Sequence, residues 1–363
     1  MKPFFKIVFF SSAKNFVTAD KTGGIEQSLY YFVRELSKRG HKIVLYTASK
    51  SKIPGVEVRN MLPSHLNNKY FNNLDESSKE KSVSFFDASA LIDFFHFKED
   101  EKFDLIIFFG YKFYEYLPFS KLTGLPIISQ INYDHGEIYP AIKEVLKKYK
   151  NVQYLPVSNS IKKTMPDLPY LEVVYPVFDF KDFVFSPKEG KYLLFIGRIC
   201  PEKGVDIAIN VAKQSNKKLI IAGPIRDIDY FEAKIKPYLD NQRIFYIGEV
   251  GFKKKVELYQ NALATLFPIR WNEPFGIVAV ESMACGTPVI AFDRAAMREI
   301  IKNGINGYIV KDGDVGQMVR AVKEISKIER KNARKYAEKL FSLEKWTDKL
   351  ENICLNLAKY GKK

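Results

Sequence analysis

Short apolar runs alternate with amphipathic stretches along most of the chain. The runs at 7–10, 42–47, 104–109, 126–131, 154–157 and 173–175 have the length and composition of buried strands. Between the first two runs, Leu29, Phe32, Val33 and Leu36 recur at helical spacing, and Gly40 follows them. This order of strand, loop, helix and strand predicts a parallel sheet covered by helices.

The second half of the chain repeats this pattern. Strands are predicted at 192–196, 218–222, 243–247, 264–267, 289–292 and 307–310, and helices at 205–214, 230–239, 254–261 and from 314 onward. Periodicity is lost at 178–190, which marks the domain boundary. We therefore expect two Rossmann-like α/β domains, 1–180 and 190–342, with parallel sheets facing across a cleft. A C-terminal helix at about 343–363 is expected to pack back onto the first domain.

The stretch RWNEPFGIVAVESMACGTPVIAF, at 270–292, is the strongest candidate for a binding site. Gly276 and Ile277 begin an apolar helix pattern, and the unpaired amides of a helix N-terminus favour an anion such as a diphosphate. Glu273 and Glu281 bracket this turn, and carboxylates there accept hydrogen bonds from sugar and ribose hydroxyls. The alternative makes Glu273 a partner of the helix dipole and Glu281 a solvated helix residue.

Other candidates follow predicted strands. Arg198 and Lys203 flank a turn where both could clamp a diphosphate. Gly23 and Gly24 place bare backbone at a helix start without a G-x-G-x-x-G fingerprint, so they suit either a phosphate or a tight turn. His135 lies just past a strand, where open α/β sheets bind ligands, although a lone histidine is more often structural.

The net charge of +15 permits nucleic acid or anionic lipid as a partner. The lysine clusters at 147–150, 217–218 and 253–255 are dispersed and no nucleic-acid motif accompanies them, so a solvated surface is expected first and an anionic membrane second. Cys200, Cys285 and Cys354 are widely spaced and indicate reduced, buried thiols in a cytoplasmic protein. No run reaches the ~18 apolar residues of a membrane span, and the opening MKPFFKIVFF indicates a strand and not a signal peptide.

Several separated blocks resemble one family. GRICPEKGVD, IAGP, YIGEV, EPFGIVAVESMACGTPVIAF and EIIKNGINGYIV occur in order and resemble the retaining glycosyltransferases of family 4, which have the GT-B fold. The resemblance covers nearly the whole second half. In the first half it rests on Gly23-Gly24, on VSNSIKK at 157–163 and on His135.

The resemblance implies roles within 270–292. Glu273 and Glu281 match the family's two glutamates separated by seven residues, the first holding donor-sugar hydroxyls and the second the ribose. Phe275, Gly276 and Ile277 match the positions whose amides contact the sugar and diphosphate.

The resemblance also implies roles outside that stretch. Arg198 and Lys203 match the pair that stabilises the leaving diphosphate, and Gly23 with Gly24 would approach the donor phosphates from the first domain. Val250 corresponds to the nucleobase-packing position, and His135 to a histidine near the reacting sugar carbon. No cofactor and no metal are expected; the acidic pairs at 227–229 and 312–314 match a D-x-D metal motif only superficially.

Two departures limit what the resemblance implies. A Gly-Ser pair common in the family is replaced in RAAMR at 294–298, so the sugar cannot be inferred from relatives. An Asn-Gly often present at the domain linker is replaced by YPV at 175–177.

The sequence therefore predicts a metal-independent retaining glycosyltransferase. Its donor is a nucleotide-diphosphate sugar, its acceptor a glycan, a glycolipid or another hydroxyl compound, and its setting cytoplasmic, with peripheral binding to the inner face of a membrane as the second expectation. No nucleic-acid partner is expected. The alternatives are a non-catalytic basic protein that binds membrane or nucleic acid on a degenerate GT-B scaffold, and a GT-B-like nucleotide-sugar epimerase.

Overall fold

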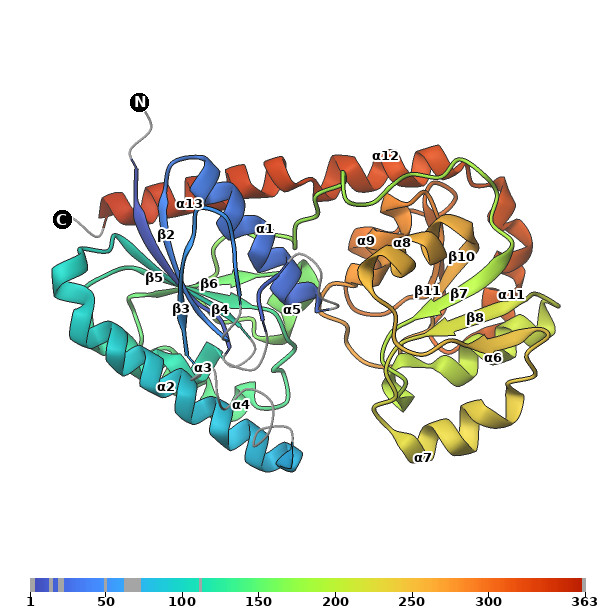
Figure 1. Cartoon of the computed structure of the whole chain (residues 1–363), viewed down its shortest axis with the longest axis horizontal. Helices are drawn as coiled ribbons and strands as arrows, with labels where there is room; N and C mark the ends of the chain where they lie inside the picture. Colours follow the sequence, from blue (N-terminus) through green and yellow to red (C-terminus); the bar gives the residue numbers. More distant parts are fainter. Residues whose placement is uncertain are drawn as a thin grey trace. The chain divides into compact units, whose positions relative to one another are not determined.

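The computed structural model describes residues 4–12, 16–18, 23–48, 51–61, 73–110 and 113–360. Contacts divide the chain into a first unit, Met1–Val177 with Leu343–Lys363, and a second unit, Phe178–Ser342. Each unit contains one six-stranded parallel sheet with helices (Figure 1). The predicted α/β class with two parallel sheets is therefore confirmed, and the predicted cleft stays a prediction.

The sheet of the first unit has the order β3-β2-β1-β4-β5-β6. Its strands are β1 (Lys6–Phe10), β2 (Lys42–Thr47), β3 (Glu57–Asn60), β4 (Leu105–Gly110), β5 (Ile127–Ile131) and β6 (Val152–Pro156). Its helices are α1 (Gly24–Lys38), α2 (Glu76–Glu101), α3 (Phe113–Tyr116), η3 (Leu117–Leu122), α4 (Tyr139–Leu146), α5 (Asn159–Thr164) and α13 (Leu343–Tyr360).

Two expectations for the first unit differ from the structure. Strand β3 reads EVRN and lies at the edge of the sheet, where an apolar pattern is not required, so its polar sequence did not predict a strand. The strand expected at 173–175 is absent, although the amide of Val174 donates to the carbonyl of Pro156 (3.1 Å). Pro169 and Pro176 flank this segment and lack the amide hydrogens that a continued ladder would need.

Helix α13 completes the core of the first unit. Trp346, Leu350 and Cys354 from this helix join the buried cluster that covers one face of the sheet together with α1. Just after α1, Arg39 contacts the buried Glu351 (2.9 Å between Nη1 and Oε2), and the buried His41 ring also contacts Glu351 (3.1 Å). These polar contacts fix α13 against the end of α1.

The sheet of the second unit has the order β12-β11-β10-β7-β8-β9. Its strands are β7 (Tyr192–Ile196), β8 (Leu219–Ala222), β9 (Ile244–Tyr246), β10 (Ala262–Phe267), β11 (Val289–Phe292) and β12 (Gly307–Val310). Its helices are η4 (Pro201–Lys203), α6 (Val205–Gln214), α7 (Ile228–Tyr230), η5 (Phe231–Ile235), η6 (Lys236–Tyr238), α8 (Phe252–Asn261), α9 (Ile277–Ala284), α10 (Met297–Ile300), α11 (Val315–Glu324), η7 (Ile325–Lys327) and α12 (Arg330–Phe341).

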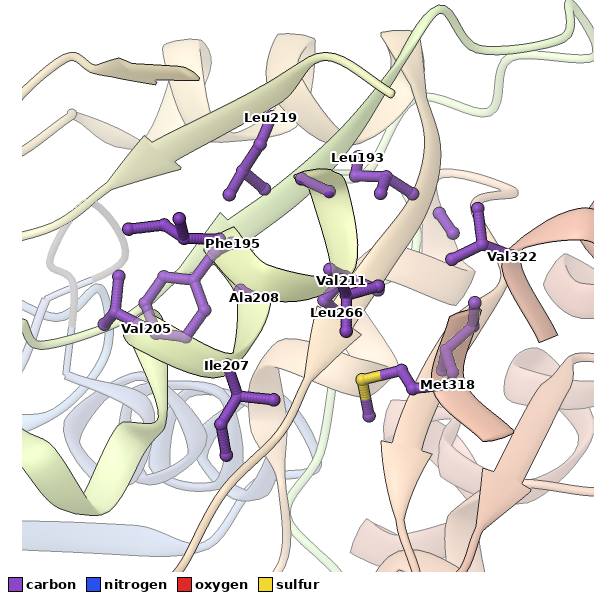
Figure 2. Packing of buried hydrophobic residues seen from close by; sticks show 14 of the residues in the cluster. Leu193, Phe195, Val205, Ile207, Ala208, Val211, Leu219, Leu266, Met318 and Val322 are labelled. Atoms are coloured by element: carbon purple, nitrogen blue, oxygen red, sulfur yellow. The ribbon is translucent and has the colours of Figure 1, made fainter. Parts of the chain in front are cut away.

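The core of the second unit lies between its sheet and its helices. Figure 2 shows side chains of β7, β8 and β10 packed against α6, with Met318 and Val322 of α11 beside them. The helix predicted at 230–239 is broken into α, π and 3₁₀ turns over Ile228–Tyr238, and Pro237 lies in its last turn, where it has no amide hydrogen to donate.

All three cysteine side chains are buried and free, as expected from the sequence. Among the described helices, none has the length and apolar character needed to cross a membrane.

Candidate functional site

The topology of the second sheet points to its centre. From β7 the chain proceeds outward to β8 and β9, then returns to the other side of β7 and proceeds outward through β10, β11 and β12. Strands β7 and β10 are therefore adjacent neighbours whose following loops diverge. In open α/β sheets, the carboxyl ends of strands at such a switch point form the ligand site. The loops that follow β7 and β10 carry most of the residues predicted for donor binding.

The loops after β7 and β10 are fastened together. The Arg270 guanidinium makes two bonds to Asp206, at 2.9 and 2.7 Å, and the Arg270 amide donates to the carbonyl of Glu202 (2.8 Å). Gly204 has φ +71°, and a Cβ there would lie 2.1 Å from the carbonyl oxygen of Pro268. Burial disfavours the charged form of Asp206, but hydrogen bonds from Arg270 and Tyr230 outweigh it and lower the Asp206 pKa. The ion pair between Asp206 and Arg270 therefore persists at neutral pH.

Lys203 and Glu273 meet at this place. Lys203 Nζ lies 2.6 Å from Glu273 Oε2, and both side chains are largely buried, at 14% and 17% exposure. Trp271 Nε1 donates to the same oxygen (3.0 Å), and the Lys203 ammonium lies 4.6 Å from the centre of the Trp271 ring. An ammonium and a carboxylate are thus held in contact at the switch point. The sequence did not lead us to predict the hydrogen bond from Trp271 to Glu273. The only indication was that Trp271 lies two residues before Glu273.

Arg198 is not part of that contact. Its side chain is 47% exposed and lies 3.6 Å from Glu202, four residues along the same loop. The structure therefore brings Lys203 together with Glu273 and leaves Arg198 at the surface of the loop after β7. The predicted role of Arg198 toward a diphosphate stays a prediction.

The turn into α9 has a demanding backbone. Gly276 caps the helix with φ +106°, and a Cβ there would lie 2.4 Å from Met297 Cε. Phe275 is buried against the ring of Phe341, with the ring centres 5.4 Å apart, which anchors the turn. Ile277 is the first helical residue, so its amide has no partner within the helix. The turn thus provides backbone donors beside Glu273.

Glu281 is not a solvated helix residue, so that alternative is wrong. It is 2% exposed; Lys255 Nζ lies 2.5 Å from Oε1, and the Tyr259 hydroxyl donates to Oε2 (2.9 Å). Burial and the Glu281 charge raise the pKa of Tyr259, so this hydroxyl stays protonated. Each carboxylate oxygen has further lone pairs, so the predicted bond to a ribose stays a prediction. The sequence pattern did not identify Lys255 and Tyr259 as partners because their separation from Glu281 depends on the packing of α8 against α9.

The predicted residues of the first unit lie at the carboxyl edge of its sheet. Gly23 caps α1 with an ordinary φ of −80°, so the turn does not require glycine for a left-handed backbone. A Cβ at Gly23 would instead lie 2.2 Å from a carboxylate oxygen of Glu26. Gly24 is the first residue of α1, and the His135 ring packs edge-on against Tyr114, with centres 5.5 Å apart. Their roles toward a donor stay predictions.

The remaining candidates are Val250 and the two acidic pairs, all of which lie in the second unit. Val250 is partly exposed and follows β9 in the second unit. Asp227 and Asp314 cap α7 and α11 by accepting backbone bonds from Tyr230 and Gln317, both at 2.8 Å. Asp312 pairs with Arg294. The acidic pairs therefore have structural roles in helix capping and ion pairing.

These features define the class of protein. Two Rossmann-like units with parallel sheets form the GT-B fold, and a solved structure with this fold supports the assignment. The crystal structure of HepE from Anabaena in complex with UDP and glucose aligns over 96% of this chain and 99% of its own, with a TM-score of 0.73 at 17% sequence identity.

The model of the glycosyl transferases group 1 family matches residues 178–340, nearly the whole of the second unit. The chain is 29% identical to an uncharacterized glycosyltransferase of Methanocaldococcus jannaschii over 46% of this chain and 49% of that protein. It is 28% identical to the O-antigen chain mannosyltransferase RfbU of Salmonella typhimurium over 52% of this chain and 54% of that protein. The matched part thus spans about half the length of these curated relatives.

Proposed function

We propose that this protein is a retaining glycosyltransferase that moves a sugar from a nucleotide-diphosphate sugar to a hydroxyl of a glycan or lipid-linked acceptor. The observation that carries the proposal is the contact between Lys203 and Glu273 at the switch point of the second sheet. In a nucleotide-diphosphate sugar, neutral hydroxyls and anionic oxygens are only a few bonds apart. A carboxylate and an ammonium in contact match that juxtaposition.

In this proposal the two groups act on opposite sides of the bond that breaks. Glu273 orients the sugar by accepting bonds from its hydroxyls, and Lys203 stabilises the charge that develops on the leaving diphosphate. Arg198 adds a second positive charge from the same loop, in place of a divalent metal. The amides of Gly276 and Ile277 complete the donor contacts, and Glu281 receives the ribose.

The test is transfer measured with Glu273→Gln in a buffer containing EDTA. The donor is first chosen by a thermal-shift panel of UDP-, GDP- and ADP-sugars, with UDP-glucose tried first because HepE was solved with UDP and glucose. We expect kcat to fall by about 10²–10³-fold, the loss typical of removing one group that stabilises a transition state. Turnover by the unchanged protein in EDTA tests metal independence in the same assay.

The matched control is Glu232→Gln. Glu232 makes a contact of the same length with Lys236, 2.6 Å, but both side chains are about half exposed on the surface of the second unit. It should leave kcat unchanged. Near-normal transfer by Glu273→Gln would overturn the site assignment, and transfer that requires magnesium would overturn the metal-free mechanism.

We further propose that the protein acts in surface polysaccharide or glycolipid assembly on an anionic membrane. The net charge of +15 supports this. In the first unit, Phe85 and Ile92 of α2 are 70% and 61% exposed. They are two helical turns apart and so lie on one side of the helix. Such exposed apolar side chains on a basic protein suit a lipid surface.

A further inference from the structure

A cavity of about 440 Å³ lies at the carboxyl ends of β11 and β12 in the second unit. Its lining includes Asp293 directly after β11, Arg298 in α10, and Lys311 and Asp312 directly after β12. Arg298 belongs to the RAAMR stretch, where the chain departs from the family pattern, and Asp312 to an acidic pair that matches a metal motif only superficially. The cavity therefore joins two segments whose side chains have no role in the proposed donor site.

The strand order separates this cavity from the donor site. Strand β12 is the edge of the sheet, and β11 lies between it and β10. The loops that carry Lys203 and Glu273 follow β7 and β10, beyond β11. Because neighbouring strands are ~4.8 Å apart, β12 lies roughly 10 Å from β10. The described lining residues include none of those proposed for donor binding.

Both carboxylates of the cavity are paired with arginines. Arg298 Nε lies 2.5 Å from Asp293 Oδ1, and Arg298 Nη2 donates to the other oxygen of the same carboxylate. Arg294 donates to Asp312. The hydrogen bonds from Arg298 lower the pKa of Asp293, so this pair stays ionised at neutral pH. The two negative charges are therefore offset before any ligand arrives.

The donors that remain at the cavity favour an anion. Among the described residues, the Lys311 ammonium has no ion pair, and Arg298 keeps Nη1 beyond its two bonds to the carboxylate. Asn303 uses its oxygen to accept from the Ile309 amide (2.7 Å), so its amide nitrogen is left as a donor. With Arg294 counted, three cations accompany two carboxylates, which leaves one positive charge in excess.

The size and the apolar wall of the cavity indicate that the ligand also has an organic part. Ile309 and the buried Val310 contribute this wall. A volume of about 440 Å³ falls within the range of roughly 300–1,000 Å³ that is usual for small-molecule sites. A bare inorganic anion would occupy only a small part of that space and would leave the apolar wall without a contact.

We propose that this cavity binds a small organic phosphate. The three donors from Lys311, Arg298 and Asn303 match the three terminal oxygens of a phosphate monoester, whereas a carboxylate offers two oxygens. The organic part then lies against Ile309 and Val310. The site is independent of the proposed function, because its ligand is not the sugar donor and its residues take no part in transfer.

The experiment is isothermal titration of the whole chain with glucose 6-phosphate and with inorganic phosphate. Lys311→Met should weaken glucose 6-phosphate binding by about tenfold, the loss expected for one hydrogen bond to a charged group. Asp293→Asn should tighten it by about threefold or more, because Arg298 is released from its partner and one negative charge is removed. Opposite shifts from two residues of one cavity cannot both result from unfolding.

The matched control is Lys302→Met. Lys302 is exposed and adjoins Asn303, but it is not among the lining residues, so its removal tests general attraction by a basic surface. It should change the affinity by less than about twofold. Lys203→Met should likewise leave glucose 6-phosphate binding intact. Loss of binding in Lys203→Met, with normal binding in Lys311→Met, would move the phosphate to the switch point and overturn this site while the proposed function stands.

Three further results would overturn the proposal. The first is that the unchanged protein binds no glucose 6-phosphate. The second is that Lys311→Met and Asp293→Asn shift the affinity in the same direction or not at all. The third is that inorganic phosphate binds as tightly as glucose 6-phosphate, because the apolar wall would then contribute nothing. None of these outcomes depends on whether the protein transfers a sugar.

Discussion

Ala295 has a backbone conformation that usually belongs to glycine. Its φ is +49°, in the loop between β11 and α10. The family resemblance leads one to expect a glycine near this position, and the chain keeps the left-handed backbone without the residue that adopts it most easily.

Ala295→Gly should therefore stabilise the second unit. Relief of the left-handed alanine contributes about 1–2 kcal/mol, and the greater freedom of glycine in the unfolded chain removes about 0.4–1 kcal/mol, so a net gain of about 0.5–1 kcal/mol is expected. Urea unfolding measures this. The control is Ala296→Gly, where φ is −74° and the methyl group is buried, and which should lose about 1 kcal/mol. Destabilisation by both variants would contradict the strain argument.

For single residues, the sequence indicated which side chains are candidates for binding but not which side chains they contact. Lys203 and Glu273 were both selected as candidates, but nothing in their spacing predicted that they touch. Lys255 was only one lysine of a basic cluster until the packing of α8 on α9 gave it Glu281. Residue type and a neighbouring turn suffice to indicate binding chemistry, whereas pairing depends on contacts between distant elements.

Among the helices, α12 is attached to its neighbours through a buried arginine side chain. Arg330, its first residue, is 8% exposed and donates to the carbonyls of Ser186 (2.8 Å), Ala262 (2.8 Å) and Gln260 (2.9 Å). Burial lowers its pKa to about 10, so the guanidinium remains charged at neutral pH. It thereby joins α12 to the end of α8, to the start of β10 and to the segment before β7.

Arg330→Met should destabilise the second unit by roughly 2–4 kcal/mol, because several buried carbonyls lose their donor at once and this outweighs the relief of a buried charge. The measurement is the urea midpoint. Lys331→Met, one residue along on the exposed side of the same helix, should change stability by less than about 0.5 kcal/mol. Equal midpoints for the two variants would show that the buried anchor adds nothing.

Elements with apolar patterns were the predictable ones. Strands β7, β11 and β12 and helix α6 begin and end where the pattern predicted, because each buries a continuous apolar face. Strand β3 could not be predicted, since this edge strand of mostly polar residues is held by backbone pairing with β2 and by Arg59, which bonds Tyr46 and Glu101. The segment at 173–175 carried the right side chains, and Val174 donates to Pro156, but the flanking Pro169 and Pro176 have no amide hydrogens with which a ladder could continue.

For the whole molecule, charge leads to a prediction about membranes. Because the net charge is +15, the protein should sediment with vesicles that contain anionic phosphatidylserine. Binding should fall as salt is raised from roughly 0.05 to 0.5 M, because salt shortens the Debye length and so screens the attraction between protein and lipid charges. Phe85→Ser with Ile92→Ser should weaken the salt-resistant remainder. Binding to neutral vesicles alone, or none, would remove the membrane from the proposed setting.

The second unit is a continuous piece of chain, whereas the first unit is made from two pieces, with α13 returning after the second unit is finished. During synthesis, Trp346, Leu350 and Cys354 emerge long after the sheet whose apolar face they cover. The nascent first unit must therefore wait, with part of its core open, while the second unit folds. A chain that stops before Leu343 leaves that face uncovered, so the first unit completes its core only after α13 has been synthesised.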